Sequence, residues 1–257
     1  MNDDFYFGYH DKAAPAQARF VRRAVIGMAV LVGALAALLA ARQQPQPVGR
    51  FEFGTSRAFE GVLYELPVPA LRVPANGGVA TNFVLVGFGK HGLPGFARGH
   101  DGKKVRFNGT LIQKDRLVMI ELNDEKSFQV LGEPAAHERR GASESLGEVS
   151  LTGELVDTKC WSGVMRPATG KVHRACAVRC LSGGVPPGLL LRDEQGNAVV
   201  VLLAGADGGK LAYDVEWAAR VVLARGELEL RDDLPVLRVT SLTLESPSKR
   251  GASSSFP

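Results

Sequence analysis

The longest uninterrupted apolar segment of the chain runs from Ala24 to Ala41, eighteen residues without a charge. As a helix it would be about 27 Å long, at roughly 1.5 Å per residue, which is enough to cross the core of a bilayer. Arg22 and Arg23 stand directly before it, and this bias favours a cytoplasmic N-terminus and an exported body. We therefore expect a single transmembrane helix that contacts membrane lipid through residues 24–41.

A cleaved signal peptide is the competing interpretation, because the segment ends in the small-residue run Ala37–Ala41. The 23 residues that precede the segment are many for the charged start of a signal peptide. The apolar run is also longer than the usual 7–15 residues. These features favour an uncleaved signal anchor, and a segment that is apolar on every face is not typical of a core helix.

The rest of the chain alternates short apolar runs with turn residues and shows few helix signals. This pattern predicts a mainly β body, with strands over residues 58–64, 82–87, 105–112, 117–122, 149–156, 188–192, 198–203, 220–230 and 234–239.

Three of these runs match three later ones, which indicates an internal repeat. The pairs are 59–63 with 151–155, 83–89 with 199–205, and 105–112 with 222–229, at offsets of 92, 116 and 117. Two copies of about 90–100 residues fit five-stranded Greek-key barrels of the oligonucleotide/oligosaccharide-binding (OB) type, and a β-sandwich is the alternative. The offset grows by 24 between the first and second pairs, so the second copy carries an insertion between Gly153 and Val199.

The predicted organisation follows from these elements. It comprises a cytoplasmic segment (1–23), the anchor (24–41), a spacer (42–50), a first OB-like domain (51–131), a linker (132–146), a second OB-like domain (147–245) with a helical insertion (157–184), and a flexible tail (246–257).

All three cysteines of the chain lie inside this insertion, together with one histidine. A helix over Lys171–Ser182 would place His173, Cys176 and Cys180 on one face, while Cys160 arrives from the preceding strand. Three sulfurs and one imidazole suit zinc or copper(I), and Asp157 could receive the second imidazole N–H.

Positive charge is abundant around the cysteines and would favour thiolate over thiol. The candidates are Lys159, Lys171, Arg174 and Arg179.

Two further interpretations of the cysteines stay open. In an oxidising compartment Cys160 could form a disulfide with Cys176 or Cys180, leaving one spare thiol. That thiol could also serve thiol–disulfide exchange. Trp161 would either cover this site or plug a barrel end.

The spacing Asp157-x-Lys159-Cys160…His173-Arg-x-Cys176-x₃-Cys180 resembles a segment of exported or membrane-anchored bacterial proteins that have no established activity. The resemblance covers about 40 residues. It implies a bacterial, exported protein with a Cys/His motif, which places the anchor in the inner membrane and the body in the periplasm.

Composition and motifs narrow the functional classes. The net charge of +4 is mild and its lysines and arginines are dispersed, so nucleic-acid binding gains no support. The chain has no nucleophile elbow, phosphate loop or dinucleotide fingerprint. We interpret the remaining histidines as loop residues, and the hairpin carboxylates, among them Glu121, as turn residues. We expect a non-enzymatic, membrane-anchored periplasmic protein that binds copper or zinc. Its role would be metal handling, or accessory service to a membrane redox complex. The alternatives are an interaction subunit with a disulfide-braced loop and a thiol–disulfide exchange protein.

Overall fold

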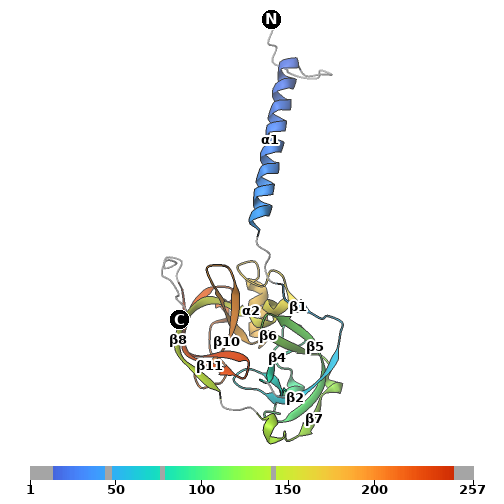
Figure 1. Cartoon of the computed structure of the whole chain (residues 1–257), viewed down its shortest axis with the longest axis vertical. Coiled ribbons are helices and arrows are strands. Elements are labelled where there is room, and N and C mark those ends of the chain that lie inside the picture. The colour runs from blue at the N-terminus through green and yellow to red at the C-terminus, as the bar shows by residue number, and fades with distance from the viewer. Residues whose placement is uncertain (1–13, 44–47, 76–78, 140–142, 246–257) are drawn as a thin grey trace. The chain divides into compact units, whose positions relative to one another are not determined.

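The computed structural model describes residues 14–43, 48–75, 79–139 and 143–245, so the expected tail and parts of the N-terminal segment, spacer and linker lie outside the described residues. Helix α1 (Pro15–Arg42) contains the expected anchor and begins with proline, which suits the first turn because its missing N–H would have no partner there. None of its residues is buried, and Figure 1 shows it as one continuous helix. Its length and hydropathy support a single-pass membrane anchor.

The first barrel consists of β2 (Arg57–Tyr64), β3 (Ala70–Val73), β4 (Thr81–Gly87), β5 (Lys104–Lys114) and β6 (Leu117–Leu122). The order β5-β2-β3-β4-β6 closes through pairing of β5 with β6, and only β4 and β6 run parallel. Two short strands, β1 (Arg50–Phe51) and β7 (Gln129–Gly132), extend β5 outside the barrel.

The second barrel repeats this topology with β8 (Glu144–Asp157), β9 (Pro187–Arg192), β10 (Ala198–Gly205), β11 (Val221–Arg231) and β12 (Leu234–Leu244). Its order, β10-β12-β11-β8-β9, is closed, and β10 and β12 form the only parallel pair of the barrel. Both barrels therefore have the strand order of the OB fold, and the sequence prediction of a mainly β chain with two such units is confirmed.

Equivalent positions in the two barrels verify the duplication. Gly61 pairs with Val105 in the first barrel, as Gly153 pairs with Val222 in the second. Both glycines are required, because a Cβ on either would lie 2.5 Å from a carbonyl oxygen of the next strand. The match between β4 and β10 differs by two residues from the one expected from sequence. Val84 pairs with Met119, and Leu202 pairs with the equivalent residue Val236, so Val84 is equivalent to Leu202. A two-residue slip keeps every side chain on the same face, so the apolar pattern could not detect it.

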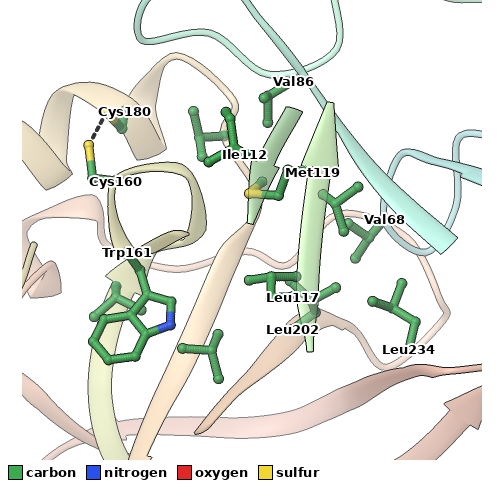
Figure 2. Packing of buried hydrophobic residues seen from close by; sticks show 14 of the residues in the cluster. Val68, Val86, Ile112, Leu117, Met119, Cys160, Trp161, Cys180, Leu202 and Leu234 are labelled. Carbon is green, nitrogen blue, oxygen red and sulfur yellow. Dashed lines mark hydrogen bonds between the residues drawn. The ribbon is translucent and has the colours of Figure 1, made fainter. Parts of the chain in front are cut away.

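Three apolar cores hold the body together. Each barrel encloses its own core, with Leu85 in the first and Val201 in the second. A third cluster, the inter-barrel core, contains outward-facing side chains of both, including Val86 on β4 and Leu202 on β10 (Figure 2). These strands are buried on both faces, which explains their nearly continuous apolar runs. The outward face of the second and third strands, where OB folds commonly bind ligands, is thus covered.

Polar contacts also join the barrels. Arg72 on β3 donates to both carboxylate oxygens of Asp232 in the β11–β12 turn, at 2.9 and 3.0 Å. The backbone N–H of Asn82 on β4 donates to Asp233 at 2.9 Å. The carboxylates of this turn, interpreted from sequence as turn residues only, also connect the two barrels. The described residues from 48 to 245 cluster as one compact unit.

Candidate metal centre

The predicted insertion is the connection between β8 and β9, residues 158–186, where the first barrel has only residues 65–69 between β2 and β3. It contains a single turn of π-helix, η4 (Cys160–Val164), and helix α2 (Arg174–Ser182). Hydrogen bonds fix its first turn: the Thr158 hydroxyl donates to the carbonyl of Pro186, and the Ser162 hydroxyl to that of Thr158, both at 2.8 Å. The helical insertion expected in the second barrel is present.

The three cysteine sulfurs converge on one point. The Sγ atom of Cys160 lies 3.9 Å from that of Cys176 and 3.8 Å from that of Cys180. All three sulfurs lie within 4.8 Å of one another. Cys160 and Cys180 are buried, and Cys176 is partly exposed. Figure 2 shows Cys160 pointing from η4 toward Cys180 on α2.

These separations are those of ligands around a common ion. Tetrahedral bonds of about 2.3 Å, the length of a zinc–sulfur bond, separate two sulfurs by roughly 3.8 Å. A disulfide needs a bond of about 2.05 Å, and the three cysteines are free. The disulfide expected as an alternative therefore has no support from the geometry.

His173 and Asp157 form a second group that shares Cys160 with the first. The Nε2 atom of His173 lies 2.9 Å from Oδ2 of Asp157, and both side chains are buried. The other oxygen of Asp157 accepts the backbone N–H of Cys160 at 2.8 Å. Asp157, Cys160 and His173 have ligand atoms within 4.8 Å of one another, but His173 does not group with Cys176 and Cys180. The four proposed ligands and Asp157 thus form two sets of three that share Cys160.

The local conformation explains this division. Helix α2 begins at Arg174, later than the expected Lys171, because Gly170 turns the chain at a φ of +72°. His173 is therefore the residue before the helix rather than part of its face. Its ring lies against Asp157 at the end of β8, while Cys176 and Cys180 stand one turn apart on α2.

The cation at the sulfurs comes from the first barrel. The Nζ atom of Lys90 donates to Cys176 at 2.7 Å and lies 4.0 Å from Sγ of Cys180. The hydrogen bond to Cys176 raises the pKa of Lys90. The pKa of the Cys180 thiol is lowered by the hydrogen bond from Cys160, and further by the charge of Lys90, against the cost of burial. Both effects favour negative charge on sulfur.

Sequence reasoning assigned this electrostatic role to other residues. Lys159 instead turns into the first barrel and pairs with Glu121, and Arg174 pairs with Glu216 at 2.8 Å. No contact of Lys171 or Arg179 with a sulfur is observed in the described part of the chain. Lys90 was missed because it lies 86 positions before Cys176, in a glycine-rich stretch without a motif.

Close backbone contacts position Lys90. The backbone N–H of Gly92 donates to the carbonyl of Gly183, directly after α2, at 2.9 Å. A Cβ on Gly183 would lie 1.9 Å from the carbonyl oxygen of Lys90, and one on Gly92 would lie 2.0 Å from that of Gly184. Only glycine permits this approach of the two segments, which sets the Lys90 side chain beside the sulfurs.

Trp161 lies in the inter-barrel core and not over the sulfurs. It is 6% exposed, and the Nζ atom of Lys114 lies 3.2 Å from the centre of its ring. Its ring extends away from the Cys160–Cys180 contact (Figure 2). Trp161 therefore anchors the insertion between the barrels.

No protein-family model matches the chain, and no curated protein matches it. The function is therefore inferred from the geometry of the site itself.

Proposed function

We propose that this chain is a membrane-anchored metal-binding protein that holds copper or zinc through the thiolates of Cys160, Cys176 and Cys180. The observation that supports this most strongly is the 3.8–3.9 Å separation of the sulfurs. Thiolates are soft ligands that select copper(I) and zinc over hard cations such as Ca²⁺ and Mg²⁺. Burial in an apolar core protects such a site from solvent.

The location proposed for the protein is the bacterial inner membrane, with the N-terminus in the cytoplasm and the body in the periplasm. It is supported by the arginines that precede the apolar run, by helix α1 and by the resemblance of the cysteine motif to exported proteins. An anchored carrier of this kind suits metal handling beside a membrane redox protein, which is the partner we propose.

Thiol titration of the full chain in detergent tests the proposal. The protein is isolated without chelator, and its accessible thiols are counted before and after addition of a strong chelator, and again after reductant. We expect few reactive thiols at first and three after chelation alone. Two thiols that appear only after reductant would show a disulfide instead and contradict the proposal.

Thiol–disulfide exchange is the second candidate function, because Cys176 is partly exposed and receives a hydrogen bond from a lysine. In that case the Cys176 thiolate would attack the disulfide of a partner, release one partner thiolate and leave a mixed disulfide that Cys160 or Cys180 resolves. This function requires that the partly exposed Cys176 thiol reacts freely without chelator, so the same titration distinguishes it from metal binding.

A further inference from the structure

The donor atoms around the sulfurs differ from those of a four-ligand zinc site. Three sulfurs share one centre, and the described residues provide no fourth ligand that groups with all three. The Nε2 atom of His173 contacts Asp157 at 2.9 Å, and His173 does not group with Cys176 and Cys180. Lys90 is the nearest cation, but an ammonium group has no lone pair and cannot bind a metal.

Water is also a poor source of a fourth ligand on the buried side. Cys160 and Cys180 are 2% and 1% exposed and belong to the inter-barrel core together with Trp161 and Val185. A metal ion on that side would be shielded from solvent. Lys90 offsets one negative charge of the thiolates with either metal, so the choice of metal is argued from the number of ligands.

We infer that the site binds copper(I) in three-coordinate, all-sulfur geometry; this inference depends on the proposed function and names its metal. Sulfurs at these separations enclose an in-plane centre roughly 2.2–2.5 Å from each, close to the ~2.3 Å length of a metal–thiolate bond. A metal ion can therefore bind in the plane of the sulfurs without a fourth ligand. Soft thiolates select both copper(I) and zinc, but structural zinc is almost always four-coordinate, so a site with three ligands favours copper(I).

His173 then supports the site without binding the metal. It lies against Asp157, which also accepts the N–H of Cys160, so the pair fixes the backbone that carries the first sulfur. A substitution of His173 by glutamine should retain the metal stoichiometry, whereas serine at Cys160, Cys176 or Cys180 should abolish it. Lys171→Gln provides a matched control, because Lys171 is an exposed residue of the same insertion.

The test uses the full chain in detergent, reduced and without oxygen, titrated with Cu(I) and Zn(II) against chromophoric chelators. X-ray absorption at the metal edge then reports the bound atoms in the unmutated protein. We expect one Cu(I) per chain, at least 100-fold stronger binding of Cu(I) than of Zn(II), three sulfur neighbours and no nitrogen. The affinity of His173→Gln for Cu(I) should lie within about threefold of that of Lys171→Gln.

A nitrogen neighbour that disappears in His173→Gln, or tighter binding of Zn(II), would overturn the copper assignment and leave the proposed metal-binding function intact. Failure of the reduced, unmutated chain to bind either metal would overturn both. Because the absorption measurement needs no variant, the assignment stays testable even if a cysteine substitution prevents folding.

Discussion

Lys159 and Glu121 form a buried ion pair that joins the cysteine-containing insertion of the second barrel to strand β6 of the first. The ammonium group of Lys159 also donates to the carbonyls of Gly87 and Gly89, at 2.7 and 2.6 Å. Its three N–H donors thus meet three acceptors, which is the condition under which a buried charge is tolerated. Glu121, interpreted from sequence as a turn residue, is instead 4% exposed and structural.

Substitution of Lys159 by methionine should destabilise the body by about 3–5 kcal/mol, because it leaves the Glu121 carboxylate buried without its partner. Chemical denaturation of the full chain, followed by tryptophan fluorescence, measures the change. The double variant Lys159→Met with Glu121→Leu should recover a large part of the loss. The exposed pair of Lys103 with Glu133 is the control, and Lys103→Met should have little effect. Equal effects at the two lysines would contradict this interpretation.

Lys90 should control the reactivity of the sulfurs after the metal is chelated. Its replacement by glutamine removes the cation that contacts Cys176 and that lowers the pKa of Cys180. The pH at which half of the Cys180 thiol reacts with an alkylating reagent should therefore rise. Lys90→Arg should keep this pH close to that of the unmutated chain. An unchanged pH profile in Lys90→Gln would show that the lysine has no electrostatic role.

The close contact between the glycines of the two barrels should tolerate no side chain. Gly183→Ala would force a Cβ to within 1.9 Å of the carbonyl oxygen of Lys90, so the segments must separate. We expect a loss of about 1–3 kcal/mol in unfolding free energy, typical of overpacking, and a thiol pH profile shifted as in Lys90→Gln. Gly95→Ala is the control, since nothing lies within 4 Å of the position of its Cβ. Similar unfolding free energies for Gly183→Ala and Gly95→Ala would contradict the close contact of Gly183 with Lys90.

Glu229 should make the second barrel sensitive to acid. Burial acts to raise the pKa of Glu229, but its contacts with Arg238 at 3.0 Å and Arg231 at 2.7 Å outweigh burial and lower it. A carboxylate with a lowered pKa stabilises the fold at neutral pH, and this contribution disappears as the pH falls through and below about 4.3, the unfolded value.

The matching experiment compares unfolding free energies of the unmutated chain and Glu229→Gln at pH 7 and pH 3.5. Glu229→Gln should be less stable at pH 7, and the difference between the two proteins should shrink at pH 3.5. A constant difference across this range would show that ionisation of Glu229 contributes nothing.

Much of the fold could be predicted from the sequence because its signals are local. The apolar run of α1, the turn residues between strands and the cysteines one helical turn apart each depend on neighbouring positions. The insertion was detectable because the strand around Gly153 matches the strand around Gly61, while the later matched strands are separated by a larger offset. Convergence of Cys160 with α2 followed from the shortness of the connecting segment.

The remaining features depend on contacts between residues far apart in the chain. Lys90 and Glu121 reach the insertion across 86 and 38 positions, and nothing in the neighbouring sequence of either residue indicates its partner. His173 departs from the expected ligand face because of a backbone turn at Gly170, which residue periodicity does not reveal. The packing of one barrel on the other is visible in sequence only as apolar runs without alternation.

Elemental analysis of the full chain, isolated in detergent without added metal or chelator, tests the central claim most directly. The account predicts about one copper or zinc ion per chain, which is lost in Cys176→Ser while the variant keeps its β-sheet circular dichroism. Less than a tenth of an ion per chain, even after reconstitution of the reduced protein with either metal, would contradict it.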